Sequence, residues 1–519
     1  METGGVDNRR LEATWTYHNH TKHSPASVRT GGYGLDWANQ PLPYKIYSTL
    51  EPLALPQDLS FPRTAALDAI AAGEAATPGT ARMPDLRTLA GLLYLSGGIT
   101  KRIRLSWGSM DFRAAACTGA LYHIEIYLVC ADLPDLPAGV YHFGVHDFAL
   151  RRLRTGDFRA AVAEATGSEP SVASAPVVVV LTTTFWRNAW KYRARAYRHA
   201  FWDSGTILAN FLAASAAYRL PARVVCGFAD AEANRLLDLD TQREVAVAMV
   251  ALGRDGPAPS AAPEITPLGL ATVPLSGTEV DFPAIRAMHA ASSLQSAGEV
   301  QAWRAGGPPR SSRGPAASLV PLQPLPDFVL PPDPLSRVIV RRGSSRRFLR
   351  EPIPFAHLST MLDRATRGIP ADFLEPPGTI LNDLHLIAHA VDGLPSGAYA
   401  FRREASALEP IREGDFRRHA GYLALEQPLA ADASANVYFL ADLAPILERF
   451  GNRGYRVAQL EAAIMGGRLY LAAYALGLGA TGLTFYDDDV TEFFSPHAAG
   501  KSVMFLTALG VPARRGRRT

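Results

Sequence analysis

The chain repeats itself at a distance of 258 residues, and this duplication limits the folds open to it. Leu136–Phe143 aligns without a gap with Leu394–Phe401, and Gly156–Arg159 aligns with Gly414–Arg417, which has the same four residues. The same offset places Arg195, Tyr197 and Arg198 on Arg453, Tyr455 and Arg456. Because solenoid repeats are about 20–50 residues long, this period predicts two copies of a whole domain instead.

Length and composition divide the 519-residue chain further. A single hydrophobic core stops growing near about 250–300 residues, so two copies explain the length better than one domain. Residues 256–327 are rich in Pro, Ala, Ser and Gly, as linkers are. Within them, Phe282–Trp303 is expected to be helical and to dock on a copy. We therefore expect an arm at 1–80, copies at 81–255 and 328–519, and a basic C-terminal tail.

Each copy is expected to combine helices with short strands. Runs of apolar and β-branched residues predict strands, and apolar residues at helical spacing from Leu460 to Leu478 predict a long helix. The expected strands are Ile124–Cys130, Val177–Leu181 and Val245–Leu252 in the first copy and Leu384–Ala388, Val437–Leu440 and Val503–Leu509 in the second. Helices layered on one sheet per copy indicate an α+β fold.

Charge and cysteine content exclude several classes of protein. Lys and Arg total 52 against 49 Asp and Glu, and four arginines in the last seven residues account for the net charge of +3, so we expect no nucleic-acid partner. Three scattered cysteines suit neither a disulfide framework nor a zinc site, and His18, His20 and His23 have no further ligands nearby, so we expect no metal. Without a signal peptide or a membrane-length apolar run, we expect a cytoplasmic protein with no membrane partner.

An arginine-rich segment opens the second copy. In Arg341–Phe348, Arg342, Ser344 and Arg346 alternate, so an extended or turning backbone would place two guanidinium groups and a hydroxyl on one side. Planar guanidinium groups bind phosphate oxygens bidentately. The segment is therefore either a phosphate clamp or a solvated basic surface run.

A glycine motif near the C-terminus matches the dinucleotide fingerprint only in its letters. Gly477–Gly482 reads G-x-G-x-x-G, but the fingerprint needs a strand before it and a helix after it. Here a long helix precedes it and Leu483–Tyr486 is strand-like, so we expect a helix ended by glycine. We expect the following Asp487–Asp489 to cap the next helix.

Two segments that could carry chemistry occur only in the first copy. The small residues Cys117, Thr118 and Gly119 form a turn that either lets backbone approach a flat ligand or serves packing alone. Lys191 stands beside Tyr192, and a neighbouring lysine can lower the pKa of a phenol and let it act as a general base. The alternative is a surface lysine next to a buried tyrosine.

These segments together resemble the nitroreductase superfamily, and within it the SagB-type dehydrogenases of azole-modified peptide pathways. The resemblance covers both copies beyond about residue 80, and the arm at Tyr17–Ser24 also looks like the start of that subfamily. Its most specific parts are Gly119–Tyr122 with Glu125, Gly139–Tyr141, and Lys191–Tyr192 with Arg195–Arg198. Family members bind FMN between two α+β subunits, so the resemblance implies two fused domains forming a pseudo-dimer within one chain, which could dimerise further.

Carried over residue by residue, the resemblance implies one composite FMN site. The second copy would supply the phosphate clamp, a strand beside the flavin ring and a basic C-terminus: Arg342, Ser344, Arg346, Gly479, Thr481, Gly482, Arg514 and Arg515. The first copy would supply the turn over the flavin and the catalytic pair: Cys117, Thr118, Gly119, Lys191 and Tyr192. Ala116–Cys117 departs from the family's usual Pro-Ser. The reciprocal site would need Lys22, Ser24 and Glu375–Pro377, and we expect it to be degenerate and empty.

The resemblance also implies a reaction. SagB-type enzymes oxidise thiazoline or oxazoline rings in peptides to azoles, so Tyr192, helped by Lys191, would take a carbon-bound proton while hydride passes to flavin N5. The substrate would be a peptide or a small molecule, in a biosynthetic complex. Two alternatives stay open: an FMN reductase of the nitroreductase type fed by NAD(P)H, and a non-catalytic peptide-binding component of such a complex.

Overall fold

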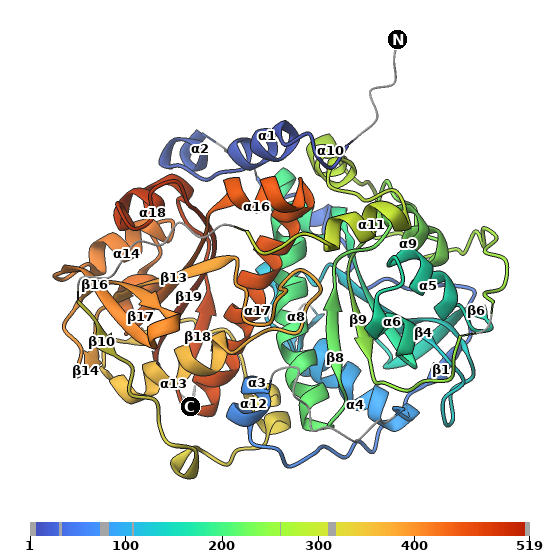
Figure 1. The fold of residues 1–519 in the computed structure, drawn as a ribbon, viewed down its shortest axis with the longest axis horizontal. Helices are drawn as coiled ribbons and strands as arrows, with labels where there is room; N and C mark the ends of the chain where they lie inside the picture. The colour runs from blue at the N-terminus through green and yellow to red at the C-terminus, as the bar shows by residue number, and fades with distance from the viewer. Residues whose placement is uncertain are drawn as a thin grey trace.

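The computed structural model describes residues 7–30, 34–72, 83–105, 108–259, 261–309 and 318–513, and its two similar halves lie side by side (Figure 1). The first sheet runs in the order β1 (Pro52–Ala54), β6 (Ala149–Thr155), β5 (Gly139–Gly144), β4 (Ile124–Cys130), β7 (Val177–Thr184), β9 (Glu244–Leu252) and β8 (Ala222–Val225). The second runs β10 (Val320–Pro321), β16 (Ala407–Glu413), β15 (Gly397–Arg402), β13 (Asn382–Ala388), β17 (Ala435–Ala441), β19 (Ser502–Pro512) and β11 (Phe348–Leu349), and β18 (Gly479–Gly482) also pairs with β19. The shared strand order confirms the predicted duplication.

Helices surround the two sheets in the same chain order, as the predicted α+β fold requires. The first half contains α4 (Leu86–Gly97), η2 (Thr118–Ala120), α5 (Arg159–Ala165), α6 (Pro170–Ser174), α7 (Phe185–Tyr192), η3 (Arg193–Arg195), α8 (Ala196–Ala217) and α9 (Asp230–Leu236). The second contains α13 (Phe355–Thr366), η5 (Arg403–Ala405), α14 (Arg417–Leu423), α15 (Pro428–Asp432), α16 (Leu443–Phe450), α17 (Arg453–Ala475) and α18 (Asp487–Phe494). Short ladders join β2 (Ile99–Leu105) to β3 (Gly108–Arg113) and β12 (Ile353–Pro354) to β14 (Val391–Asp392). None of the described helices is both long and apolar enough to cross a membrane.

The arm and the linker pack across both halves. The arm contains α1 (Glu12–His20), α2 (Pro25–Thr30), η1 (Trp37–Asn39) and α3 (Ala66–Ala71). The linker contains α10 (Pro283–Ala291) and α11 (Ala297–Arg304), and η4 (Asp327–Val329) and α12 (Leu335–Arg341) lead into the second half. Figure 1 shows α1 and α10 side by side along the top of the molecule. In α11, the Trp303 indole donates to the Phe450 carbonyl oxygen of the second half at 3.0 Å. The expected helix at Phe282–Trp303 thus docks as expected, but as two helices.

The repeat extends further toward the N-terminus than the 258-residue offset indicates. β1 pairs with β6 as β10 pairs with β16, and α3 meets α12 through two reciprocal hydrogen bonds of 3.0 Å, from Leu335 N to Thr64 O and from Ala66 N to Asp333 O. The counterparts in α3 and α12 are 269 residues apart and those in β1 and β10 are 267 apart, so an insertion hides them from a gap-free alignment at 258. Residues 52–72, which the sequence places in the arm, supply a strand and a helix to the first half.

The two halves meet along α8 and α17, which lie together at the centre of the molecule (Figure 1). A Cβ added to Gly205 would lie 2.5 Å from the Cβ of Ala463, and one added to Gly467 would lie 2.6 Å from the Cβ of Ala209. The 258-residue offset places Gly205 on Ala463 and Ala209 on Gly467, so each glycine faces its own counterpart. Such self-contacts mark the axis of a two-fold interface.

Two buried ion-pair clusters flank this axis and obey the same symmetry. Asp487 of the second half pairs with Arg195 (3.0 Å) and Arg198 (2.6 Å) of the first. Asp230 of the first half pairs with two arginines of the second, Arg453 (2.6 Å) and Arg456 (2.7 Å). Asp487 begins α18, as predicted, but its carboxylate joins the two halves and makes no side-chain capping bond to its own helix.

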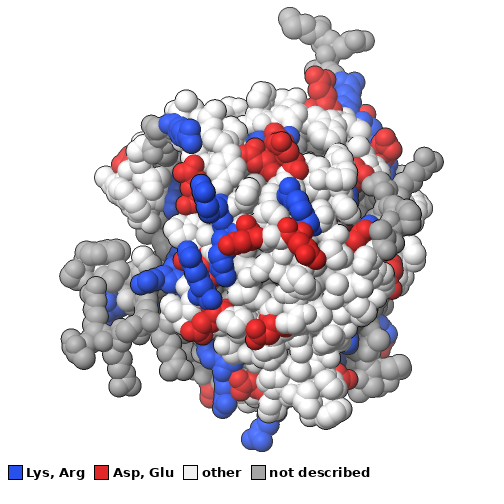
Figure 2. Space-filling view, turned by 90° about the vertical axis from the view of Figure 1, so that its left-hand side faces the viewer, with Lys and Arg blue, Asp and Glu red and all other residues white. Residues whose placement is uncertain are grey.

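Basic and acidic side chains alternate on the face of the second half (Figure 2). Ion pairs within the second half include Arg402–Glu409, Lys501–Asp383 and Arg350–Asp432. Because opposite charges lie next to each other, this face has no broad region of one sign among the residues that the structure describes.

Breaking one buried cluster should destabilise the whole molecule. Asp487→Asn leaves two buried arginines without a carboxylate, and losing one partner of a buried pair costs about 3–5 kcal/mol of unfolding free energy. Denaturant unfolding followed by circular dichroism measures the loss. Glu232→Gln is the control, since it removes an exposed pair with Arg235 that contributes about 0–1 kcal/mol. Equal losses in the two variants would contradict a central role for the buried cluster.

Acid should destabilise the protein through the same two aspartates. Burial alone would raise the pKa of Asp230 and Asp487, but their arginine partners lower it to about 2. An unfolded aspartate has a pKa near 3.8, so the stabilisation is present above that value and is lost as the pH falls from about 4 toward 2. Unfolding curves across this range should show a shallower pH dependence for Asp487→Asn. Parallel pH dependences would contradict this assignment.

Candidate functional site

Arg342 of the second half is held by the backbone of the first half. It follows α12, and its Nε donates to the Ala114 carbonyl oxygen at 2.9 Å while a terminal nitrogen donates to the Arg113 carbonyl oxygen at 3.0 Å. Its guanidinium also lies 5.8 Å from the ring centre of Tyr470. Burial lowers the pKa of this guanidinium, and neighbouring tyrosines partly oppose the effect. The arginine segment thus lies at the boundary between the halves.

The rest of the arginine segment is fixed to β18. Ser345 N donates to the Ala480 carbonyl oxygen at 2.9 Å, and the Ser344 hydroxyl lies 3.2 Å from the Tyr470 hydroxyl, which also accepts from Gly482 N. A side chain at Gly479 would collide with Ser345 Oγ, which is buried and has no hydrogen-bond partner among the described residues. The fold therefore brings the predicted clamp and the Gly479–Gly482 strand together, with Thr481 buried between them.

Three cations converge where the two halves meet. Arg346 is exposed, and its charge lowers the pKa of both Lys191 and Tyr192 in the other half, which places it close to them. Burial lowers the pKa of Lys191 more than Arg346 does. No described carboxylate lies within ion-pair distance of Arg342, Arg346 or Lys191. Unpaired cations gathered at one place suit an anionic ligand.

The turn at Cys117–Gly119 is held by hydrogen bonds to Asp203 of α8. This carboxylate accepts from Cys117 Sγ at 3.0 Å, from Thr118 N at 2.9 Å and from Thr118 Oγ1 at 2.8 Å. It also contacts His123 Nε2 at 2.9 Å. Burial, together with the nearby carboxylate, raises the pKa of the Cys117 thiol, so this cysteine is a neutral hydrogen-bond donor. Sequence analysis missed Asp203, whose only signal is a carboxylate within an otherwise buried helix.

Tyr192 lies directly over this turn. Gly119 has φ +63°, and a Cβ there would lie 2.7 Å from the Tyr192 hydroxyl oxygen. The tyrosine ring packs edge-on against His199 with ring centres 4.6 Å apart. Glycine is therefore required both for the backbone conformation and for the approach of the phenol.

The predicted lowering of the Tyr192 pKa is wrong. Burial raises the pKa of Tyr192, the negative charge of Asp203 raises it further, and the positive charge of Arg346 opposes this rise. Lys191 Nζ lies 5.3 Å above the tyrosine ring centre, so it faces the ring and does not donate to the phenol oxygen. The phenol is consequently neutral at neutral pH.

An aromatic surface lies beside Tyr192 and was also missed. Tyr192 and Leu35 pack against a small apolar cluster that comprises Leu121, Trp186, Trp190 and Leu275. The Trp190 indole donates to the Asp36 carbonyl oxygen at 2.9 Å, and this holds the arm against α7. Trp37 packs on Trp190 with ring centres 5.3 Å apart and is 66% exposed. The arm thus presents an indole face to solvent close to the Lys191–Tyr192 pair.

Several other predicted residues lie elsewhere. Lys22 pairs with Asp488 at 2.7 Å, and Ser24 forms a turn with Ser27, so neither lies in a clamp. His18 Nδ1 lies 3.2 Å from the Tyr455 hydroxyl, and no group of three metal-binding side chains occurs in the described ranges. Arg514 and Arg515 lie outside the described residues.

Comparison with known proteins places this arrangement in one family. A nitroreductase family model matches residues 121–254 and 339–512, which together make up more than half of the chain. A candidate nitroreductase from Anabaena variabilis ATCC 29413 has a crystal structure that covers 96% of this chain and 99% of its own, with 26% identity and a TM-score of 0.75. The candidate nitroreductase MJ1384 of Methanocaldococcus jannaschii is 24% identical over 167 residues, which are 30% of this chain and 82% of that protein.

A chain of the E. coli microcin synthetase McbBCD complex with bound truncated pro-MccB17 is 20% identical over 47% of this chain and 92% of its own, with a TM-score of 0.29. That likeness concerns the fold alone. The family model and the Anabaena structure both extend over the two halves. The chain therefore belongs to the nitroreductase family, whose members are typically flavin-dependent oxidoreductases, and it carries two copies of the family's domain.

Proposed function

We propose that this chain is an FMN-dependent dehydrogenase that oxidises an azoline ring, or a related C–N group, in a peptide or small-molecule substrate. The observation that supports this most is the meeting of two sets of residues that belong to different copies. Arg342 and Arg346 come from the second copy, and Gly119, Lys191 and Tyr192 come from the first. The proposed single site is therefore composite.

The residues at this site fit FMN. The phosphate monoester is a dianion, and Arg342 and Arg346 offer guanidinium groups without carboxylate partners. Ser345 Oγ is a buried hydroxyl without a hydrogen-bond partner among the described residues, and it lies so close to Gly479 that no side chain would fit there. When bound, FMN would supply a two-electron hydride acceptor, chemistry that no side chain provides.

The chain's own residues would position the reactants and hold a proton. The turn held by Asp203 would contact the flavin ring, and its Gly119 lets the Tyr192 hydroxyl lie close to that turn. Tyr192 Oη would take the carbon-bound proton of the substrate. Its pKa is raised, so the phenol must first give its own proton to solvent. Arg346, whose charge lowers the Tyr192 pKa, would favour the phenolate, and Lys191 holds a second cation over the ring.

The aromatic surface beside Tyr192 would suit a substrate with a planar ring. Trp37 is exposed and meets Trp190 edge to face, and the apolar cluster that contains Trp190 packs against Tyr192. A flat heterocycle can stack on an indole while its C–H faces the phenol. The resemblance to SagB-type dehydrogenases supports the same substrate class.

Removing a clamp arginine should weaken FMN binding. Arg342→Ala loses a charge-assisted bond to the phosphate, worth about 1.5–3 kcal/mol, so the dissociation constant for FMN should rise about 10- to 100-fold. Fluorescence titration of the apoprotein with FMN measures it. Arg350→Ala, an exposed arginine paired with Asp432 near the same segment, is the matched control. Equal affinity in wild type and Arg342→Ala would contradict the clamp.

Removing the phenol should stop turnover without releasing flavin. Tyr192→Phe keeps the ring that packs on His199, and loss of a general base lowers the rate about 10²- to 10⁴-fold. Lys191→Ala should act in the same direction with less effect. Absorbance gives flavin content, and azole formation from an azoline peptide gives turnover. Tyr422→Phe, in the second copy, is the control. Normal turnover in Tyr192→Phe would show that another group accepts the proton.

One measurement separates the two alternative functions. Anaerobic mixing with NAD(P)H would bleach the flavin rapidly if the protein were a reductase, whereas an azoline peptide alone would bleach it if the proposal holds. A preparation that stays colourless after FMN is added would indicate a non-catalytic binding protein.

A further inference from the structure

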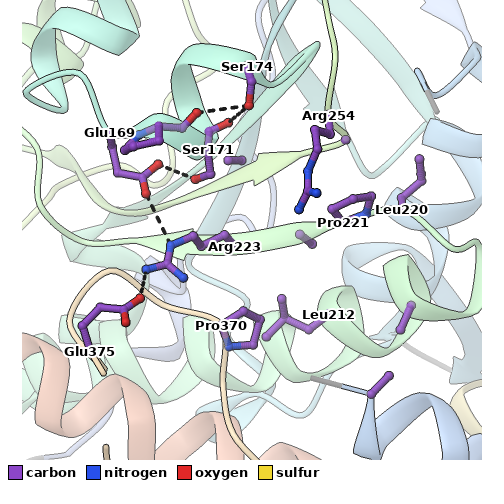
Figure 3. A pocket seen from close by; sticks show the side chains of 16 residues that line it. Glu169, Ser171, Ser174, Leu212, Leu220, Pro221, Arg223, Arg254, Pro370 and Glu375 are labelled. Atoms are coloured by element: carbon purple, nitrogen blue, oxygen red, sulfur yellow. Dashed lines mark hydrogen bonds and ion pairs between the residues drawn. The ribbon is translucent and has the colours of Figure 1, made fainter. Parts of the chain in front are cut away.

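A second cavity occupies the pseudo-symmetric position of the composite site. It has a volume of about 440 Å³ and lies beside β8, α8 and α6, and a loop of the second half containing Pro370 and Glu375 also lines it (Figure 3). The 258-residue offset places its residues Pro221, Ala222 and Arg223 on Gly479, Ala480 and Thr481, and places Leu212 and Ala216 on Tyr470 and Tyr474. The cavity is therefore the counterpart of the proposed FMN site.

The features that suit a phosphate group are missing from this counterpart. Leu212 replaces Tyr470, whose hydroxyl joins the clamp to β18. Pro221 replaces Gly479, a position where the second half has no room for a side chain because Ser345 Oγ lies against it. In sequence, α12 runs directly into the arginine segment, whereas the six residues after α3, Ala72–Thr77, include Glu74 and no arginine.

The counterpart cavity is lined by two carboxylates, Glu169 and Glu375, at positions that are uncharged in the proposed FMN site. Arg223 forms an ion pair with Glu375 of the second half, and its Nε lies 3.4 Å from Glu169 of the first (Figure 3). Glu169 also accepts from Val172 N at 3.0 Å. The offset places Cys117 at the position of Glu375 and Gln427 at that of Glu169, and both are uncharged. A phosphate dianion entering this cavity would meet two negative groups and an arginine already paired with them.

The catalytic pair has also been lost at this end. Arg449 and Phe450 stand where the other site has Lys191 and Tyr192. The Arg449 guanidinium donates to the backbone carbonyl oxygens of Trp303 at 2.7 Å and of Gly307 at 2.6 Å, which ties it to the linker. It is therefore committed to holding the segment after α11.

We infer that flavin binds at only one of the two pseudo-symmetric sites, and that the counterpart has become a brace in which Arg223 joins the two copies through Glu169 and Glu375. This inference rests on the proposed function. It assigns one FMN to each chain and gives Arg223 a structural role that its counterpart Thr481 lacks.

Counting flavin in full-length variants tests the inference. The wild-type chain, saturated with FMN and desalted, should carry one FMN per chain by absorbance. Arg342→Ala should lose that flavin, whereas Arg223→Ala should keep one FMN with unchanged affinity. Two FMN per chain in the wild type, FMN retained by Arg342→Ala, or FMN lost from Arg223→Ala would each overturn the inference.

A second readout does not depend on flavin. If Arg223 braces the copies, Arg223→Ala should lower the melting temperature of the apoprotein by about 2–4 °C. Arg235→Ala, which removes an exposed ion pair in the same half, should change it by less than a third as much. Equal shifts would overturn the brace. A wild-type chain that takes up no FMN would refute the proposed function. A wild-type chain that takes up two FMN would leave the proposed function standing and refute this inference.

Discussion

The close approach of α8 and α17 is the contact on which the rest of the molecule depends. Gly205 and Gly467 let the two helices approach at the pseudo-two-fold axis, and this approach sets the positions of the side chains on both helices. Asp203, two residues before Gly205, holds the turn of the first copy, and Tyr470, three residues after Gly467 on the partner helix, contacts the arginine segment of the second. Because each half of the site stands on a different helix, the site exists only while the helices keep this register.

Much of the architecture could be predicted from the sequence, because the repeat preserves spacing. The duplication and the central strands follow from positions along the chain, whereas the meeting of Arg342 and Arg346 with Gly119 and Tyr192 is implied by the resemblance to the nitroreductase superfamily. Asp203 and Tyr470 could not be found this way, since a single polar side chain in a buried helix has no pattern. The Tyr192 pKa was predicted with the wrong sign because burial and a carboxylate 11 residues further along the chain outweigh the adjacent lysine.

Fusing two copies into one chain frees each site from symmetry. In a homodimer every substitution appears at both sites, whereas here the two ends have diverged. Glu461, the counterpart of Asp203, accepts from Leu381 N and Asn382 instead of from a cysteine and a threonine, and burial raises its pKa to about 7. The same helix position thus holds the Cys117–Gly119 turn in one copy and a buried hydrogen-bond network in the other.

The arm and linker give this fusion a property that a simple tandem protein lacks. Asn452, at the start of α17, donates to backbone oxygens of Arg10 in the arm and Ala291 in the linker, and Thr14 donates back to it at 2.6 Å. Hydrogen bonds therefore hold both connecting segments at the interface between the copies. A cut between the copies would separate the start of α17 from arm and linker segments that it bonds. The two copies therefore fold as a pair, and neither is a self-sufficient domain.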